Sequence, residues 1–470
     1  MNLNKIYPTV DLEINEIMLN SKEQKPNSLF IDIHNSLEYT KEAIKNGAIC
    51  VITKINYDID IDQIIVDDPR VELAYIASSM YDYPSLKLKL LGVTGTDGKT
   101  TTATIFQSIM DDCGYIGTNG ISYRNINIKT NNTTPNSMTI NQSFKKMINS
   151  NIKHCALELS SHAISEKRIC NLLFDCIIFT NLSKEHLDYH KSMDQYYQTK
   201  KEIFKNIKSN GLAIINNDDF YGRKLMMEIK QKIMTFGIDS YSDVMAKNIR
   251  KNEFFILFDL VYNDIIYPDF KLNLPCIFNV YNALGAICGL IYYGLDILEI
   301  KEKLERVSQI KGRMLNLTKN EPYNFIIDFA HTPNALYYLL SEARSFTKNN
   351  LVIVFGCGGN KDRSKRPIMG SIATTIADFV IFTSDDPKDE DVNEIIKDMT
   401  SYVEKENYLV VLDRKKAIEM AVRITNSDDT IIISGKGEET EFHDQYHSYH
   451  YSDKEELIKA LKLYKHIEAL

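Results

Sequence analysis

The sequence predicts an α/β protein of three domains, in which mostly parallel sheets are covered by helices on both faces. The chain has 470 residues, enough for roughly three domains of ordinary size. Short apolar segments of strand length alternate with helical segments, a pattern typical of parallel sheets covered on both faces. A glycine-rich turn beginning at Gly92 lies between one such strand and a helix. We expect domains at residues 1–88, 89–309 and 310–470.

The expected elements fall into three successive blocks. The first is a small N-terminal α/β domain, with strands at 28–33, 48–53 and 63–67, a helix at 71–80 and a linker at 83–85. The second is a phosphate-loop ATPase-like domain, with strands at 86–91, 154–159, 175–180 and 211–216. The third is a Rossmann-like domain, with strands at 325–328, 350–355, 378–383 and 430–434. In such sheets ligands bind at the carboxyl ends of the strands, where most of the polar motifs begin.

Composition narrows the class of protein. Hydrophobic residues make up 44% and charged residues 25%, which are ordinary globular values. The net charge of −8 and the absence of a long Lys/Arg cluster argue against a nucleic-acid partner. The eight cysteines are scattered without a C-x-x-C pair, which favours buried thiols in a reducing compartment. Neither a signal-peptide core nor a membrane-length apolar run is present, so we expect a cytoplasmic protein.

The glycine-rich turn has the composition of a phosphate-binding loop. Gly92, Gly95 and Gly98 precede Lys99 and Thr100, and a helical segment follows. Glycines let the backbone approach phosphates, amides at the helix N-terminus point at the anion, and the Lys and Thr side chains suit phosphate and Mg²⁺. The strict motif has glycine where Val93 stands, so this is a variant. The loop predicts a site for ATP or GTP.

Three further motifs follow strands of the second block. Glu158, at the end of the strand at 154–159, suits Mg²⁺, although alone it would be an ordinary solvent-facing carboxylate. His186 and His190 are four apart, which on one helix could form a zinc pair, but the H-E-x-x-H motif is missing. Lys200 lies in a segment that, taken alone, is an ordinary helix with its lysine facing outward.

Taken together, these motifs resemble those of the Mur ligases, the ATP-dependent amide-forming enzymes of peptidoglycan precursor synthesis. Within that family the chain is most similar to the MurE type, which adds the third residue of the stem peptide. The resemblance covers the central and C-terminal blocks almost throughout. It rests on the segments 95–101, 132–135, 158–163, 181–190, 216–219, 278–283, 312–314, 328–333, 355–363 and 435–437.

The resemblance implies a mechanism. The γ-phosphoryl group of ATP would move to a substrate carboxylate, and the amine of an amino acid would attack the resulting acyl phosphate. Lys99 would neutralise phosphate charge, Thr100 and Glu158 would hold one Mg²⁺, and His186 with a carbamylated Lys200 would serve a second. A carbamate turns a cation into an oxygen-bearing anion that can bind metal. Lys201 is the fallback for Lys200. The nucleotide contacts implied are Gly95, Thr96, Asp97, Gly98, Lys99, Thr100, Thr101, Asn282, Arg313 and, on the ribose, Asp328.

The same matching implies the site of the acceptor, a UDP-linked muramoyl dipeptide. The family usually has Gln where Glu166 stands, and its Asp-Ser-Arg appears as Asn20-Ser21-Lys22. A glycine-containing loop of the first block is replaced by residues 34–40, so another carrier stays open there. The acceptor residues implied are Ser21, Asn132, Thr133, Thr134, Ser160 and Arg168.

The incoming amino acid is implied to be a diamino acid. Two carboxylate-binding arginines of the family are Lys361 and Lys388 here, and lysine offers a point charge in place of a planar fork. Asp389–Asp391 could receive the distal amine or could be a solvated loop. Lysine, ornithine and diaminopimelate all stay open. The residues implied are Lys361, Asp385, Asp386, Pro387, Lys388, Gly435 and Glu439.

Three other functions compete with this one. A folylpolyglutamate synthase has similar ATP chemistry but lacks a comparable first block. A phosphate-loop NTPase would have no use for the segments around His186 and Lys200. A weakened paralogue that only binds nucleotide-linked peptides is favoured by Asp97, where the family prefers Asn. The presence of Lys99, Glu158 and Lys200 favours an active enzyme.

Overall fold

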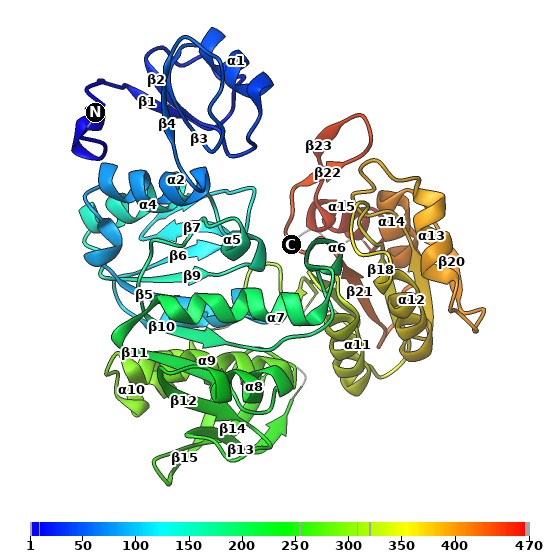
Figure 1. Ribbon diagram of the computed structural model, residues 1–470. Helices are drawn as coiled ribbons and strands as arrows, with labels where there is room; N and C mark the ends of the chain where they lie inside the picture. The colour runs from blue at the N-terminus through cyan, green and yellow to red at the C-terminus, as the bar shows by residue number, and fades with distance from the viewer. Residues whose placement is uncertain (1, 9, 253–254, 308, 319–320, 466–470) are drawn as a thin grey trace.

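The computed structural model describes residues 2–8, 10–252, 255–307, 309–318 and 321–465, and these form three main sheets flanked by helices (Figure 1). The sheets follow one another along the chain, as the predicted blocks do. A two-stranded hairpin lies near the C-terminal end. The arrangement confirms the α/β class.

The first sheet is small and entirely parallel, with strands in the order of the chain. Its elements are η1 (Leu3–Lys5), β1 (Glu16–Met18), β2 (Ser28–Ile31), α1 (Leu37–Lys45), β3 (Ala48–Thr53), β4 (Asp62–Ile65), α2 (Pro69–Met80) and η2 (Pro84–Leu86). Helix α2 begins as expected, because Asp68 caps its first turn and Pro69 suits the first helical position. The described N-terminal elements also include β1 and α1, which the sequence did not predict.

The second sheet is the largest and positions the phosphate loop. Its strand order is β15-β14-β13-β12-β11-β10-β5-β9-β6-β7-β8, parallel from β13 to β6 and antiparallel at both ends. Its elements are β5 (Lys89–Thr94), α3 (Lys99–Ile109), β6 (Cys113–Gly117), β7 (Gly120–Tyr123), β8 (Ile126–Ile128), α4 (Ser137–Asn149), β9 (His154–Glu158), α5 (Ser161–Ser165), β10 (Phe174–Phe179), α6 (Leu187–His190), α7 (Met193–Glu202), η3 (Ile203–Asn206), β11 (Ile207–Asn216), α8 (Phe220–Glu228), β12 (Lys232–Gly237), β13 (Val244–Lys251), β14 (Ile256–Tyr262), β15 (Ile265–Leu272), α9 (Ile277–Tyr292) and α10 (Ile297–Glu305).

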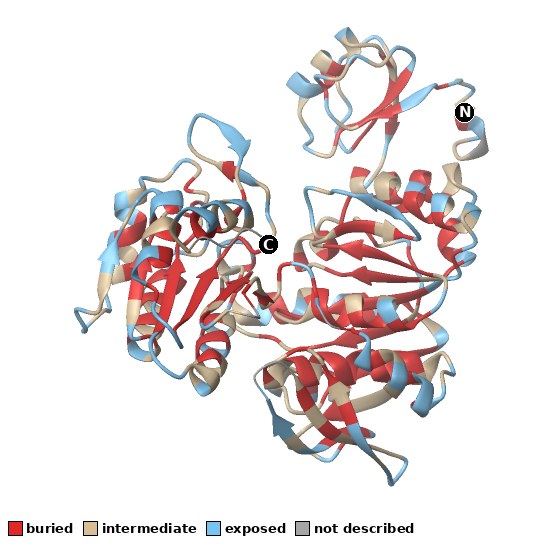
Figure 2. Ribbon diagram, turned by 180° about the vertical axis from the view of Figure 1, so that it is seen from behind, coloured by how far each residue is buried: buried red, intermediate tan, exposed pale blue. Residues whose placement is uncertain are grey.

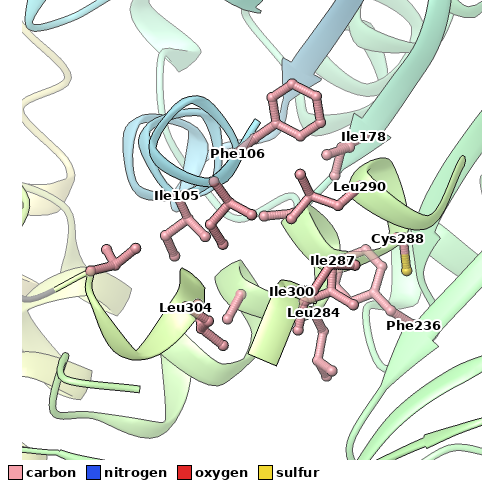
Figure 3. Packing of buried hydrophobic residues seen from close by; sticks show 14 of the residues in the cluster. Ile105, Phe106, Ile178, Phe236, Leu284, Ile287, Cys288, Leu290, Ile300 and Leu304 are labelled. Atoms are coloured by element: carbon pink, nitrogen blue, oxygen red, sulfur yellow. The ribbon is translucent and has the colours of Figure 1, made fainter. Parts of the chain in front are cut away.

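Helix α3 is packed against α9 and α10 on one face of this sheet (Figure 3). Phe106 of α3 meets Leu290 of α9, and Ile300 and Leu304 extend the same apolar layer from α10. Each of these side chains is fully buried, and burial of one such side chain contributes about 1.5–3 kcal/mol. The helix that follows the phosphate loop is therefore held rigidly.

The third sheet has the order β16-β17-β21-β18-β19-β20 and is parallel except at β16. Its strands are buried on both faces, whereas helix surfaces and edge strands are exposed (Figure 2). Its elements, with the C-terminal hairpin and helix, are β16 (Leu315–Asn316), β17 (Asn324–Asp328), α11 (Pro333–Phe346), β18 (Leu351–Phe355), α12 (Lys365–Ile376), β19 (Phe379–Phe382), α13 (Val392–Thr400), β20 (Tyr408–Val410), α14 (Arg414–Ile424), β21 (Thr430–Ser434), β22 (Glu441–His443), β23 (Ser448–His450) and α15 (Asp453–Lys465).

Two expectations about the first boundary are wrong in detail. The strand expected at 86–91 begins at Lys89, and Pro84–Leu86 form a turn of 3₁₀ helix in place of an open linker. Leu86 is 62% exposed, so its apolar side chain does not belong to the strand's core face. Helix α2 also packs against α4, where Ser78 Oγ lies 3.3 Å from Asn141 Oδ1. The first block therefore rests on the second through a helix that precedes residue 88.

Candidate active site

The phosphate loop joins β5 to α3 at the carboxyl end of the central sheet. Gly95 and Gly98 have positive φ angles of 147° and 84°. A Cβ at Gly95 would overlap the hydroxyl of Thr180, and one at Gly98 would overlap the amide of Asn282. Glycine is therefore required at both positions by conformation and by space. Lys99 folds back over the loop, and its Nζ donates to the carbonyls of Gly95 at 3.0 Å and Thr96 at 2.6 Å.

Thr100 and Glu158 meet directly beside this loop. The hydroxyl of Thr100 donates to Glu158 Oε2 at 3.0 Å, and Glu158 is fully buried. Tyr115 and Thr118 also donate to this carboxylate, so its orientation is fixed from three sides. A buried carboxylate and a hydroxyl are the hard oxygen donors that Mg²⁺ prefers, and Mg²⁺ fills its remaining positions with water and phosphate oxygens. The donor set fits the metal that the sequence implies.

Lys200 is buried in the protein, and the outward-facing interpretation of its helix is wrong. It is 1% exposed, and its Nζ donates to the carbonyl of Gly95 at 2.8 Å. Burial and then the charge of Lys99 lower the pKa of Lys200 well below its usual range. The fallback, Lys201, lies at the surface and pairs with Glu228 at 2.8 Å. A buried neutral amine is the chemical form that can react with CO₂, so the environment fits a carbamate.

His186 lies close to Lys200 but does not form a helical pair with His190. It has a left-handed φ of 55° and precedes α6, so the two rings are not successive turns of one helix. Burial lowers the pKa of His186 to about 3 and that of His190 to about 4. Within the described part of the chain, no group of three or more His, Cys, Asp and Glu side chains is arranged to hold a metal. The zinc interpretation therefore has no structural support.

Glu185, in the segment between β10 and α6, connects the central sheet domain to the third sheet domain. Its carboxylate lies 3.0 Å from His331 Nε2 and 3.5 Å from His186 Nε2. Burial would raise the pKa of Glu185, but the hydrogen bond with His331 and the nearby positive charges outweigh it and lower that pKa. Burial and then the charge of Glu185 raise the pKa of Asp97 in the phosphate loop. The C-terminal part of the chain thus contributes directly to the phosphate-loop site.

The predicted nucleotide residues approach the same loop from two sides. Arg313 Nη2 lies 3.5 Å from Thr100 Oγ1, and its guanidinium stacks on Phe329 at 4.9 Å. Asp328 is buried beside it and accepts from the backbone amides of Met314 and Ala330. Asn282 of α9 packs against Gly98. Asn282 and Arg313 thus reach the loop from distant segments, and Asp328 is held next to Arg313 by its hydrogen bond with the Met314 amide.

Most of the predicted acceptor residues lie in the central sheet domain near Glu158, whereas Ser21 lies in the first sheet domain. Thr134 lies close to the metal-binding pair, since its hydroxyl donates to the carbonyl of Glu158 at 2.6 Å and accepts from the amide of Ser160 at 3.1 Å. Arg168 donates to Glu166 through Nε at 2.9 Å and Nη2 at 2.5 Å, so the substituted Glu166 holds the arginine. Thr133 contacts Thr118, and Asn132 is exposed in the same loop. Ser21 lies in the first sheet domain, where its hydroxyl donates to Glu42.

The predicted amino-acid residues gather at the carboxyl ends of β18, β19 and β21. A fully buried Lys436 lies at their centre, with its Nζ 2.8 Å from Asp386, 3.2 Å from Glu439 and 3.8 Å from Asp385. Burial raises the pKa of Asp385 to about 6, although Arg414 and Lys436 act against it. Gly435 has a φ of 117° and leaves no room for a Cβ beside Asp385.

The acidic triplet 389–391 has structural partners. Asp389 accepts from Asn360, Glu390 accepts from Arg366, and Asp391 caps helix α13. These contacts disfavour the hypothesis that the triplet receives the amine of a substrate. Lys361 and Lys388 lie on the two loops that these contacts connect.

Four functional candidates received no role from the sequence: Glu185, His331, Lys436 and Arg366. Each has an identifiable signal, because Glu185, His331 and Lys436 are charged or titratable side chains within matched motifs, and Arg366 closely follows one. Their partners could not be read from the sequence. Glu185 and His331, for example, are 146 positions apart.

Comparison with known proteins agrees with this arrangement. The model of the Mur ligase middle domain matches residues 93–290, and that of the Mur ligase glutamate ligase domain matches residues 312–437. A UDP-N-acetylmuramoyl-L-alanyl-D-glutamate–2,6-diaminopimelate ligase of Clostridium botulinum is 36% identical, over 98% of this chain and 100% of its own length.

Two solved structures have the same fold. A structure titled as a UDP-N-acetylmuramoyl-L-alanyl-D-glutamate–2,6-diaminopimelate ligase aligns with a TM-score of 0.67 at 24% identity, covering 99% of each chain. A folylpolyglutamate synthase of Mycobacterium tuberculosis, complexed with ADP and AMPPCP, aligns with a TM-score of 0.66 at 15% identity, but over only 78% of this chain and 92% of its own.

Two further observations concern cysteines and membranes. All eight cysteines are in the described ranges, and none forms a disulfide. Across those same ranges, the helices lack the combination of length and apolar character needed to cross a bilayer.

The two family models, the near-complete alignment with a relative at 36% identity and the assembled phosphate-loop site lead to one conclusion. The chain belongs to the Mur ligase family of ATP-dependent amide-forming ligases, and within it to the MurE type.

Proposed function

We propose that this protein uses ATP to add a diamino acid to UDP-N-acetylmuramoyl-L-alanyl-D-glutamate. The observation that carries the proposal is the meeting of Thr100–Glu158, the buried Lys200 and the C-terminal residues Arg313 and His331 at one phosphate loop. The relative with 36% identity is named for this acceptor and for 2,6-diaminopimelate. ATP and a UDP-linked precursor are the expected partners, and we place the reaction in the cytoplasm.

The reaction forms an amide in two steps. The acceptor carboxylate attacks the γ-phosphorus of ATP, which gives an acyl phosphate and ADP. The amine of the amino acid then attacks the acyl carbon, a C–N bond forms, phosphate leaves, and the amine loses its proton. Lys99 places positive charge beside the phosphates, and Arg313 reaches the same loop from the C-terminal part of the chain. Holding the three reactants together removes most of the entropic barrier.

Metal ions complete this site in the proposal. Thr100 and Glu158 would hold the first Mg²⁺, and His186 with a carbamate on Lys200 would hold the second. Bound Mg²⁺ supplies positive charge that offsets the repulsion between the acceptor carboxylate and the phosphates. The lowered pKa of Lys200 supports the carbamate, because burial favours the neutral amine, the form that reacts with CO₂.

The substrates have separate places in the proposal. Asn282, Arg313 and Asp328 contact the nucleotide, with Asp328 on the ribose, and Asp97 belongs to the phosphate loop, where it accepts from Ser183. The acceptor extends from Thr134 and Arg168 toward Ser21 in the first sheet domain.

The amino acid binds at the third sheet in the proposal. Three carboxylates around one buried ammonium leave net negative charge there, which suits an amine. Lys361 and Lys388 supply separate positive charges nearby, which suit a carboxylate. A diamino acid carries both kinds of group, and diaminopimelate, lysine and ornithine are the compounds to compare.

The test is phosphate release from ATP with UDP-N-acetylmuramoyl-L-alanyl-D-glutamate and each of these amino acids, with mass spectrometry of the product. Release that requires one diamino acid and gives a product of matching mass supports the proposal and identifies the substrate. Steady release without any amino acid would indicate a phosphate-loop NTPase. No release with any compound contradicts the proposed acceptor and leaves a binding paralogue as the better interpretation.

A further inference from the structure

Two loops of the third sheet domain form one connected unit. The Lys361 loop (residues 356–364) follows β18, and the Lys388 loop (residues 383–391) follows the neighbouring β19. The amide of Gly359 donates to the carbonyl of Asp386 at 3.0 Å. A Cβ at Gly359 would overlap the carbonyl of Pro387, so the loops are in direct backbone contact.

A buried arginine fastens the two loops to each other. Arg366, on α12, is completely buried and donates to the carbonyl of Gly358 at 3.1 Å. Its guanidinium also makes a bidentate pair with Glu390, both contacts at 2.9 Å, and a third contact with Asp398 at 2.9 Å. Glu390 in turn accepts from the amide of Asn360 at 2.6 Å. One ion pair therefore contacts both loops.

The paired loops bring two lysines toward one region. Lys361 is exposed, but surrounding protein atoms and then the ammonium of Lys388 lower its pKa. Lys388 itself has a left-handed φ of 52°, and its amide donates to the carbonyl of His443 at 3.2 Å. Two neighbouring ammonium groups repel each other unless an anion lies between them. A lysine has little geometric preference of its own, so its direction depends on the loop that carries it.

We propose that Arg366 and Glu390 are positioning residues that hold the two loops so that Lys361 and Lys388 face one carboxylate of the incoming amino acid. This inference rests on the proposed function. It assigns a task to Glu390, whose carboxylate is held by Arg366 and Asn360, contacts that disfavour a role in receiving the substrate's amine. It also gives a reason for a fully buried arginine that pairs with Glu390 between the loops that carry Lys361 and Lys388.

The variant Glu390→Gln tests this. Glutamine keeps the shape of the side chain and can still accept from Asn360, but it loses the charge pair with Arg366. We expect the KM of the amino acid to rise about tenfold, corresponding to about 1.4 kcal/mol, with the KM values of ATP and of the UDP-linked acceptor within about twofold of the parent. Glu394→Gln is the matched control, because it removes the same kind of charge from the adjacent helix α13, where Glu394 pairs with Lys397 at the surface.

The readout separates positioning from general stability. An unchanged amino-acid KM in Glu390→Gln, or equal rises in all three KM values, overturns the inference. If circular dichroism finds that variant unfolded, Asp398→Asn replaces it, since Asp398 contacts Arg366 at 2.9 Å and Arg363 of the Lys361 loop at 3.0 Å, while its carboxylate has the same charge as that of Glu390 and does not pair with it. A smaller, selective rise in the amino-acid KM then supports the inference, and no rise overturns it. Wild-type protein that joins no diamino acid to the acceptor defeats the proposed function and this inference together.

Discussion

His331 Nε2 lies 3.0 Å from the buried carboxylate of Glu185, and this contact joins the third sheet domain to the loop that carries His186. His331 is oriented on its other side, since its Nδ1 lies 2.8 Å from the carbonyl of Phe329. The carbonyl of His331 accepts from Lys365 at 2.8 Å. A ligase that must bring an amino acid on one domain to ATP on another needs such a connection, because separate domains move relative to each other by default.

Removing either partner of the Glu185–His331 contact should slow the reaction, and the effects of the two substitutions should not add. We expect Glu185→Ala and His331→Ala each to lower kcat/KM for ATP, and the double variant to lose less than the sum, with a coupling energy of about 1–3 kcal/mol. The measurement is a double-mutant cycle of initial rates. Lys129→Ala is the control, because Lys129 joins the same two parts through Thr440 at an exposed position, and its cost should be below about 0.5 kcal/mol. Additive losses would mean that the two side chains act separately.

The two adjacent lysines of α7 should behave in opposite ways. Lys200→Ala removes the buried amine beside Gly95, and we expect kcat to fall roughly 100- to 1,000-fold, as for loss of a group that stabilises the transition state. Lys201→Ala removes only a partly exposed pair with Glu228, so its kcat should stay within about twofold.

Carbon dioxide offers a second readout of the same site. Rates of the parent and of Lys201→Ala should fall in degassed, bicarbonate-free buffer and recover when bicarbonate is added. Rates of Lys200→Ala should not respond. A parent enzyme that is indifferent to bicarbonate would argue against a carbamate on Lys200, while leaving the effect of Lys200→Ala to be explained by its hydrogen bond to Gly95.

Glu166 should compete with the acceptor for Arg168. It occupies Nε and Nη2 of that guanidinium at 2.9 and 2.5 Å, and charge-assisted contacts of this kind are the strong ones. We expect Glu166→Gln to lower the KM of the UDP-linked acceptor about three- to tenfold, since a neutral amide holds Arg168 less tightly. Arg168→Ala should raise the same KM, and the KM of ATP should stay constant in both. A raised acceptor KM in Glu166→Gln would show that Glu166 orients Arg168 for binding.

Asp385 should make the free energy of unfolding decrease as pH rises. Its pKa is raised from 3.8 to about 6, with burial as the main cause. A carboxyl with a raised folded-state pKa binds its proton more tightly in the folded protein. Its contribution is therefore fully present below the unfolded-state pKa and is lost as pH rises through the folded-state value.

The measurement compares Asp385→Asn with the parent by urea unfolding. We expect the difference in free energy of unfolding, variant minus parent, to increase by roughly 1 kcal/mol between about pH 5 and about pH 7.5. The reason is that only the parent must ionise a buried carboxyl. A difference that stays constant or shrinks over this interval would show that Arg414 and Lys436 compensate the buried charge fully.

The parallel strands of the fold were largely predictable. Strands such as β10 and β18 are continuous apolar runs because both faces are buried, and such runs are visible in a sequence. Strands β13, β14 and β15 were not predicted. They form an antiparallel extension in which β13 and β15 have exposed positions and β14 alternates buried with partly buried ones, so their residues do not give a continuous buried run.

The sequence by itself determined the chemistry that depends on neighbours along the chain. Gly95, Gly98, Lys99 and Thr100 belong to one loop and one helix start, so their spacing is enough to predict a phosphate site. Only the tertiary structure decided that Lys200 is buried, that Glu166 holds Arg168, and that Glu185 meets His331. Burial and charge pairing depend on segments that are distant in sequence, and they set the pKa values and side-chain directions that distinguish a surface lysine or carboxylate from one in an active site.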